Sequence, residues 1–310
     1  MDAVSLLLGF AHVGASVDKR CLLSGTTRMD VAEYQELQAP FHVLLEGECK
    51  VHVGSSVVQM HAGEVVLIPS RERHRVVTPG AGRLRGTTET AGDAFVTTRT
   101  KGGDTAVIDL FCGHYTFDAG AGAVLFNSLP DPLHVSFGDS TESLEMLTML
   151  SAMMRGEAQR DGDGTAAILS GLATVLLAMV LRTATSATAA TALWTAVADP
   201  RIAETIEHVL MMPGADWTID RLSRTAAMSR ATFLRHFRQE TGMNVGDFLV
   251  RVRVMAAAEL LNSSDRTVAA IASQVGYQSE SAFSRAFRAQ VGTTPARFRR
   301  NQQRRRQPTK

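Results

Sequence analysis

The chain has 310 residues, of which 45% are hydrophobic and 20% are charged, a length and composition typical of two folded domains rather than of a disordered chain. Its three cysteines are too few for a disulfide framework, so a small secreted scaffold is excluded and a reducing compartment is expected. The apolar N-terminal stretch carries an acidic residue and no basic one, unlike a signal peptide. We therefore expect a cytoplasmic protein.

The net charge of +1 is the sum of two oppositely charged halves. Residues 1–199 hold 14 Lys or Arg and 22 Asp or Glu, for a net charge of −8, whereas residues 200–310 hold 18 and 9, for a net charge of +9. Such a basic half indicates contact with nucleic acid or with an anionic membrane surface. The most apolar stretch, residues 166–181, is shorter than the ~20 residues of a membrane span. We expect it to be a buried or partner-facing helix, and we expect no membrane partner.

The N-terminal part of the chain shows the patterns of β-strands. Apolar and polar residues alternate with period two from residue 41 to about residue 68. Residues 107–115 predict another strand, and residues 124–129 are a further strand candidate. Residues 78–106 are rich in Gly and Thr with little periodicity, which predicts a long loop with at most a short strand around Phe95. Together these segments predict a small antiparallel β domain.

Helical spacing replaces the alternation after Pro132. Apolar residues recur every three or four positions over residues 144–154 and 168–179, which predicts two amphipathic helices that either cap the β domain or pair across a homodimer. Residues 183–192 are almost only Ala and Thr, which suits a linker. The predicted fold class is therefore α+β, in four parts: a sensor domain at residues 1–130, a helical extension at 131–182, a linker at 183–198 and an all-α domain at 199–310.

An internal repeat with an offset of fifty residues is the most specific signal in the sequence. Each copy reads Ser-x3-Phe-x-Arg-x-Phe-Arg, with a Gly four residues further on and a short apolar helix before it. Seven positions are identical at this offset: Ser229, Phe233, Arg235, Phe237, Arg238, Gly242 and Phe248 coincide with Ser279, Phe283, Arg285, Phe287, Arg288, Gly292 and Phe298. Both copies predict a helix-turn-helix.

In each predicted unit a serine, Ser229 or Ser279, is placed to cap the second helix. Two Phe residues four apart face the core and leave Arg235 or Arg285 on the outer side, where an arginine can read guanine edges in a major groove. Residues 245–261 would form a connecting helix of roughly 25 Å, so two recognition helices could enter successive major grooves, about 34 Å apart. A generic bundle with solvated arginines would explain neither the repeat nor the charge of +9.

The repeat and its flanks resemble the paired helix-turn-helix domain of AraC-type transcription regulators over roughly residues 199–300. The motifs that carry the resemblance are Met228-Ser229-Arg230, Phe233-x-Arg235-x-Phe237, Val275-Gly276-Tyr277, Phe283-x-Arg285-x-Phe287 and Pro295-x2-Phe298-Arg299. The resemblance implies base contacts from outward positions of the recognition helices, which fall here at Arg230, Ala231, Leu234, Arg235, Glu280, Ser281, Ser284 and Arg285. The resemblance also implies double-stranded DNA and RNA polymerase as partners, and it favours an activator of transcription over a repressor.

Gly63-x5-Pro69-x4-His74 resembles the second motif of the cupin β-barrel. In metal-binding cupins a preceding His-x-His and a Glu supply the other ligands, but the matching stretch, residues 33–40, lacks the pair of histidines. His42 and His114 are the obvious candidates for additional ligands beside His74. We therefore expect no bound metal, no other cofactor and no enzymatic activity.

The three cysteines receive different interpretations. Cys49 shares the phase of apolar strand residues, which predicts a core position. Cys21 follows two basic residues, a setting that favours the reactive thiolate. Cys112 alternates with apolar strand residues, which predicts that its side chain lies in the core or lines a pocket. The opening of the chain and Cys112-Gly113 resemble a cupin-containing AraC subgroup that senses reactive chlorine species through two cysteines, and these align with Cys21 and Cys112.

The sequence thus predicts a DNA-binding transcription regulator whose cupin-like domain receives the signal. In the first hypothesis, oxidation of Cys21 or Cys112 to a sulfenic acid or a disulfide changes DNA affinity. In the second, a small organic ligand or a metal occupies the barrel, with His42 and His74 at its wall. A third hypothesis, from another class, is a cupin enzyme tethered to DNA.

Overall fold

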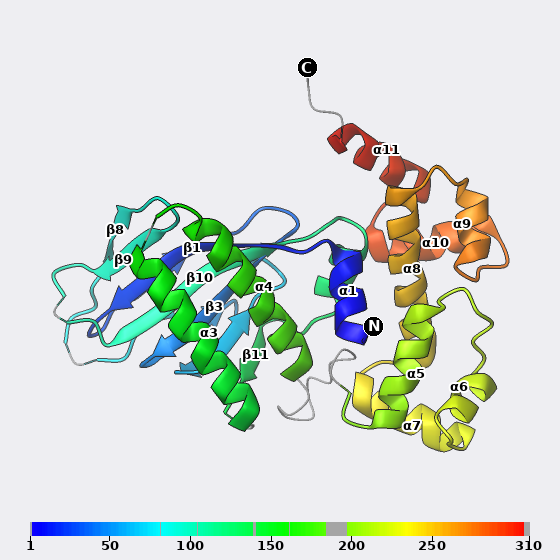
Figure 1. Cartoon of the computed structure of the whole chain (residues 1–310), viewed down its shortest axis with the longest axis horizontal. Coiled ribbons are helices and arrows are strands. Elements are labelled where there is room, and N and C mark those ends of the chain that lie inside the picture. Colours follow the sequence, from blue (N-terminus) through cyan, green and yellow to red (C-terminus); the bar gives the residue numbers. More distant parts are fainter. Residues whose placement is uncertain are drawn as a thin grey trace. The chain divides into compact units, whose positions relative to one another are not determined.

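The structure is a computed structural model that describes residues 2–80, 82–103, 105–138, 141–160, 162–183 and 197–306. Contacts divide the chain into two compact units (Figure 1). The β unit contains Val13–Thr116 and Leu129–Thr188, and the helical unit contains Met1–His12, Phe117–Ser128 and Ala189–Lys310. Most of the predicted linker lies outside the described residues.

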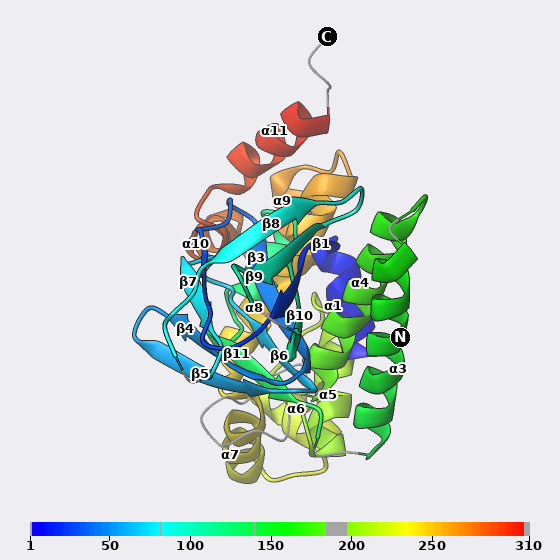
Figure 2. The same cartoon turned by 90° about the vertical axis from the view of Figure 1, so that its left-hand side faces the viewer.

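The β unit has two sheets around one core (Figure 2). The larger sheet has the strand order β11-β6-β3-β10-β1-β9-β8 and the smaller the order β2-β7-β4-β5. The strands are β1 (Gly14–Leu23), β2 (Arg28–Val31), β3 (Gln38–Glu46), β4 (Glu48–Val53), β5 (Ser56–His61), β6 (Glu64–Leu67), β7 (His74–Val77), β8 (Thr87–Ala91), β9 (Val96–Thr100), β10 (Ile108–Thr116) and β11 (Leu133–Ser136). Apolar side chains from both sheets meet in the core, among them Leu44, Leu110, Val51 and Val76. The predicted cupin-like β architecture is confirmed.

Two long helices, α3 (Thr141–Arg160) and α4 (Thr165–Thr183), belong to the β unit, as the helical extension predicts. Tyr115 on β10 donates a hydrogen bond to the carbonyl of Ala173 at 2.9 Å, and Ser170 donates to that of Ala15 at 2.7 Å. By length and composition α4 could cross a membrane, but half of its most apolar window is buried inside the structure. These contacts make α4 a packed helix of the β unit.

Two sequence predictions for this region are wrong. Residues predicted as a long loop form a hairpin, in which β8 pairs with β9. Its strands are rich in Thr, a β-branched residue that favours strands even where no apolar alternation marks them. The strand expected at residues 124–129 is replaced by a helix, α2 (Ala121–Phe126), followed by a turn. A short apolar run that is buried on all sides has no period to distinguish helix from strand.

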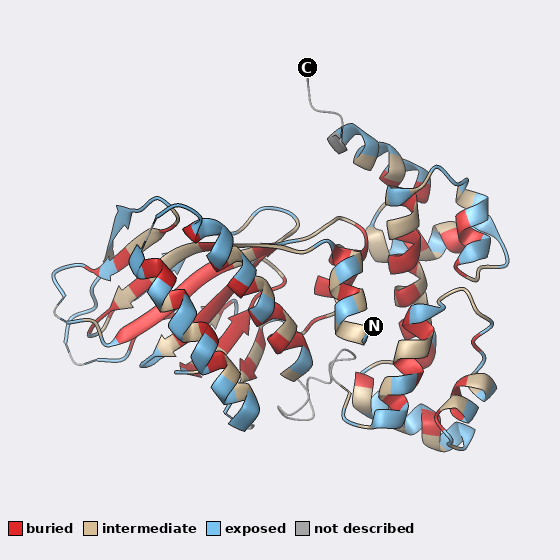
Figure 3. Ribbon diagram, viewed as in Figure 1, coloured by how far each residue is buried: buried red, intermediate tan, exposed pale blue. Residues whose placement is uncertain are grey.

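The helical unit is all α in its described residues. Its helices are α1 (Ala3–Ala11), α2, α5 (Pro200–Met211), α6 (Ile219–Thr225), α7 (Arg230–Thr241), α8 (Val245–Ser263), α9 (Val268–Gln274), α10 (Glu280–Val291) and α11 (Pro295–Arg306). The helix α8 is buried along much of its length (Figure 3) and contacts α2, α9, α10 and α11. Two helix-turn-helix units joined by a long helix are therefore confirmed.

The N-terminal helix and the segment around α2 pack on the C-terminal helices, although both fall in the predicted sensor domain. His12 Nε2 lies 2.7 Å from Glu259 Oε2 on α8. Gly120 lies so close to α8 that an added Cβ would be 2.6 Å from Ala258 Cβ and 2.8 Å from Phe298 Cζ. Residues far apart in sequence thus complete the core of the helical unit, which a sequence pattern could not reveal.

We expect Gly120→Ala to lower the free energy of unfolding by about 1–3 kcal/mol, because the added methyl group overpacks this contact. The matched control is Gly9→Ala on α1, where an added Cβ meets no atom within 4 Å. Since alanine favours a helix over glycine, the control should keep or raise stability by up to about 1 kcal/mol. Urea unfolding of both variants measures the difference, and equal stabilities would contradict the packing.

Candidate DNA interface and buried thiol site

The two helix-turn-helix units repeat each other in local structure. In both, the predicted serine caps the recognition helix: Ser229 Oγ and Ser279 Oγ accept hydrogen bonds from backbone N–H groups three residues further on, at 3.2 and 3.3 Å. Both helices end at a glycine with positive φ, 71° at Gly242 and 77° at Gly292. The repeat therefore specifies both ends of α7 and of α10.

Buried phenylalanines fix which face of each recognition helix points outward. The rings of Phe233 and Phe237 lie 5.6 Å apart, and Phe237 also contacts Phe248 of α8. Phe283 and Phe287 repeat this arrangement at 5.6 Å in the second unit. All of these rings are buried, so the opposite face of each helix is left to solvent.

The residues predicted to contact bases lie on that outer face. Those exposed are Arg230, Ala231, Leu234, Arg235, Glu280, Ser281 and Arg285, and Ser284 is half-buried. Arg230 Nε lies 3.1 Å from Asp220 Oδ1, but both side chains are largely exposed, so this ion pair is weak and exchanges readily. Ala231 and Leu234 offer apolar contact only, which leaves hydrogen-bonded base reading on α7 to the arginines.

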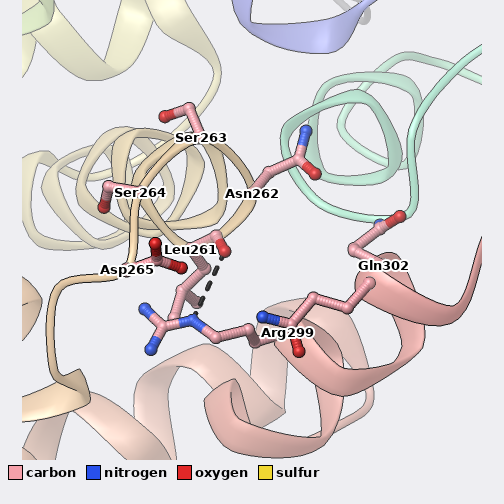
Figure 4. A pocket seen from close by; sticks show the side chains of 8 residues that line it. Leu261, Asn262, Ser263, Ser264, Asp265, Arg299 and Gln302 are labelled. Carbon is pink, nitrogen blue, oxygen red and sulfur yellow. Dashed lines mark hydrogen bonds between the residues drawn. The ribbon is translucent and has the colours of Figure 1, made fainter. Parts of the chain in front are cut away.

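The helix α11 is rich in arginine. Arg299 reaches from α11 to the end of α8, where its Nε donates to the Leu261 carbonyl at 3.4 Å (Figure 4). A pocket of about 240 Å³ lies beside it, lined by polar residues such as Asn262 and Gln302. A cation at the carbonyl end of a helix is stabilising, so Arg299 secures the joint between α8 and α11.

Inside the β unit, the four predicted effector residues form one cluster. Cys21 Sγ on β1 lies 3.7 Å from Cys112 Sγ on β10. Cys112 Sγ lies 3.0 Å from His42 Nδ1 on β3, and His42 Nε2 lies 2.7 Å from His74 Nε2 on β7. None of the four is more than 5% exposed. Two thiols and two imidazoles from four strands are therefore in contact in the interior of the β unit.

Strand register explains why these residues meet. Cys112 lies opposite His42 where β10 pairs with β3, and opposite Lys19 where β10 pairs with β1. Cys21, two residues beyond Lys19, is therefore the diagonal neighbour of Cys112 on the same face. Gly113 keeps β1 close, because a Cβ there would lie 2.1 Å from the carbonyl oxygen of Ser16.

The hydrogen bonds have one consistent direction. His74 Nδ1 lies 2.9 Å from the carbonyl oxygen of Glu72, which can only accept, so this nitrogen carries the proton. Neutral His74 then accepts at Nε2 from His42 Nε2–H, which leaves His42 Nδ1 as the acceptor for the Cys112 thiol. His42 Nδ1 is therefore placed to accept the proton of the Cys112 thiol.

Burial shifts the protonation of this cluster. It lowers the pKa of His74 and, together with the nearby His74, lowers the pKa of His42 well below its ordinary value, so both imidazoles are neutral at pH 7. The pKa of Cys112 is raised well above its ordinary value, first by its contact with Cys21 and then by burial. Cys112 is therefore the protonated donor that the geometry requires.

Of the two basic residues before Cys21, only Lys19 shares its face of β1, and the charge of Lys19 acts to lower the pKa of the neighbouring Cys112. Lys19 binds Glu89, and Arg20 pairs with Asp109 at 3.0 Å, on the opposite side of the strand. Alternation along β1 turns Arg20 away from Cys21. Cys21 Sγ instead lies 3.5 Å from Met29 Sδ, a contact that no sequence motif marks.

Two other predicted residues have different surroundings. Cys49 is fully buried in the core, as the sequence predicts, and burial raises the pKa of its thiol to about 12. His114 does not help His74, because its Nδ1 binds Asp18 Oδ2 at 2.8 Å. Among the described residues, no group of three or more His, Cys, Asp or Glu side chains could hold a metal ion.

A groove on the smaller sheet leads to one end of the cluster. It has a volume of about 670 Å³ and is lined by His74 together with His52, Arg73 and Arg75. The remaining lining residues include Arg28, Asp30 and Glu33. His74 is therefore the member of the cluster that borders the surface.

Comparisons with known proteins agree with this architecture. Residues 2–186 match the cupin family and residues 222–301 match a helix-turn-helix domain. The chain is 30% identical over 302 residues to an "Uncharacterized HTH-type transcriptional regulator" of Haemophilus influenzae, covering 97% of this chain and 99% of the relative. It is 25% identical over 301 residues to the "RCS-specific HTH-type transcriptional activator RclR" of Escherichia coli, covering 96% and 97%. The HTH-type transcriptional regulator MtrA of Neisseria gonorrhoeae is 26% identical over 311 residues, with 96% and 98% covered.

The chain therefore belongs to the AraC-type transcription regulators that carry an N-terminal cupin domain. It is a DNA-binding protein whose partner is double-stranded DNA.

We expect Arg235→Ala and Arg285→Ala each to weaken operator binding by about 1–3 kcal/mol, because each variant removes a predicted base contact. An operator selected from random duplexes and a titration at fixed salt would measure this loss. The matched control is Arg99→Ala, which removes an exposed arginine from the β unit. Equal affinities for all three variants would contradict the assignment of the recognition helices.

Proposed function

We propose that this regulator is a cytoplasmic activator whose affinity for DNA is set by oxidation of Cys21 and Cys112. The observation that carries the proposal is the buried thiol pair, 3.7 Å apart, with Cys112 on a histidine that can take its proton. The name of the relative RclR, an RCS-specific activator, supports it. So does the similarity over nearly the full length of both chains.

The chemistry has two steps. Cys21 reacts with a two-electron oxidant such as hypochlorous acid, which gives a sulfenic acid with loss of chloride and a proton. Cys112 then attacks the sulfenic sulfur, so that the S–S bond forms as the S–O bond breaks. The proton that Cys112 gives to His42 Nδ1 balances the one that the departing hydroxide takes up to leave as water, so the step releases no net proton. The site is therefore equipped with both the second thiol and its base.

Disulfide formation would require the strands to move. A disulfide holds its sulfur atoms about 2.05 Å apart, so the two Sγ atoms must approach from 3.7 Å. Diagonal neighbours on antiparallel strands are roughly 7–8 Å apart, beyond the Cα separation of about 4.4–6.8 Å that a disulfide usually spans. The bond would therefore draw β1 and β10 closer together around Cys21 and Cys112.

That movement has a direct route to the DNA-binding helices. Gly14 pairs with Thr116, so the two strands end side by side. The chain then continues into the two segments of the helical unit that contact α8, marked by His12 on Glu259 and by Gly120. Because α8 joins both recognition units, a shift of the strand ends would change how α7 and α10 are presented.

A small organic ligand is the second candidate signal. The groove of about 670 Å³ favours it, because His74 and three arginines line this space and could bind an anion. Such a ligand would act on His74 and through it on His42. Thermal-shift screening of anionic metabolites distinguishes this signal from oxidation.

A homodimer and RNA polymerase complete the proposed partners. Exposed apolar side chains on α3 and α4 support a dimer, among them Met149 and Met153 at 62% and 59% exposure and Ile168 and Val175 at 45% and 47%. The regulatory names of the relatives support a role other than that of an enzyme.

We expect Cys21→Ser and Cys112→Ser each to abolish the response of a reporter promoter to hypochlorous acid, because either change removes one half of the disulfide. The matched control is Cys49→Ser, which alters a buried thiol of the same core. It should keep the response. An undiminished response in both Cys21 and Cys112 variants would disprove oxidative control through this pair.

A further inference from the structure

Thr98 on β9 carries a hydroxyl that the structure leaves unused. The side chain is fully buried, and its Oγ1 has no hydrogen-bond partner among the described residues. Buried hydroxyl groups are nearly always paired, because an unpaired one loses its bonds to water without replacement. The Thr98 hydroxyl can therefore take a new hydrogen-bond partner without giving up an existing one.

The register places this hydroxyl beside Cys21. Strands β1 and β9 run parallel, with the Cα of Cys21 paired to that of Thr98. Paired residues on adjacent strands point to the same face, and both side chains are buried. The next threonine on this face, Thr100, is fully engaged: its Oγ1 lies 2.8 Å from Thr27 Oγ1, accepts a hydrogen bond from the Ser24 N–H at 2.9 Å and lies 3.2 Å from the Ser24 carbonyl oxygen. Unlike Thr100, Thr98 therefore has a buried hydroxyl group with no hydrogen-bond partner among the described residues.

Cys21 lies between Thr98 and Cys112. The strand order β10-β1-β9 puts Cys112 on one side of Cys21 and Thr98 on the other. When a thiol attacks a sulfenic sulfur, the S–S bond forms on the side opposite the S–O bond that breaks. The best place for a group that holds the departing oxygen is therefore the β9 side, where Thr98 is.

We infer that the Thr98 hydroxyl donates a hydrogen bond to the sulfenic oxygen on Cys21 and aligns it for displacement by Cys112. This inference rests on the proposed function. The oxygen, absent from the reduced thiol, is the acceptor that satisfies the Thr98 hydroxyl. As the S–O bond breaks, negative charge grows on the oxygen and the hydrogen bond strengthens. Thr98 is thus a positioning residue for disulfide formation rather than a part of the reduced fold.

The test compares Thr98→Val with Thr98→Ser in the full chain. After a pulse of hypochlorous acid, quenched samples measure how fast the Cys21–Cys112 disulfide appears. Thr98→Val should slow this step about tenfold, the effect of losing one hydrogen bond to a developing charge. Thr98→Ser keeps the hydroxyl and should retain most of the rate.

Thermal unfolding separates this role from a structural one. Thr98→Val removes an unpaired hydroxyl, so the reduced protein should be at least as stable as the parent. The matched control, Thr100→Val, breaks existing hydrogen bonds and should lower the melting temperature.

Trapping with dimedone distinguishes failure of this inference from failure of the proposed function. In Cys112→Ser the sulfenic acid on Cys21 cannot be resolved and should be labelled, with or without Thr98→Val. Labelled Cys21 together with an unchanged disulfide rate in Thr98→Val would overturn the role of Thr98 alone. Absence of label on Cys21 would overturn the proposed function, and this inference with it.

Discussion

The pairing of β1 with β10 is the contact on which the rest of the molecule depends. It brings Cys21 and Cys112 to one face of the larger sheet, 3.7 Å apart at sulfur. The same two strands end side by side at Gly14 and Thr116, and the chain continues from both into segments of the helical unit. In the proposed mechanism, a change in this pairing would alter both the thiol pair and the segments that contact α8.

Because the two thiols lie in the buried core around this strand pair, their chemistry depends on the polar groups beside them. A thiolate is costly in a buried apolar setting, so a reactive cysteine there depends on groups that take its proton and hold its oxidised form. In the proposed function His42, backed by its contact with His74, would take the proton. Thr98, on the far side of Cys21, would hold the oxidised form. Cys49 lies in the same core without such neighbours and remains a packing residue.

Local patterns in the sequence predicted the DNA-binding half well. A repeated Ser, two Phe residues and a Gly determine the caps and the buried face of each recognition helix, and all of these are set within a dozen residues. The sensor half depends on pairing between distant strands, which local pattern does not encode. Sequence could name Cys21, Cys112, His42 and His74 as candidates, but their contact rests on the register of β1, β10, β3 and β7. For the same reason it missed Thr98, the β8–β9 hairpin and the packing of α1 and α2 on α8.

The most direct test of the central claim is the affinity of the full chain for its operator before and after formation of the Cys21–Cys112 disulfide. Peptide mapping by mass spectrometry would establish the bond in the same sample. Oxidation should change the affinity about tenfold, within the usual range of coupling between two sites, and reduction of the disulfide should restore the starting value. An unchanged affinity in protein with this disulfide fully formed would contradict the claim.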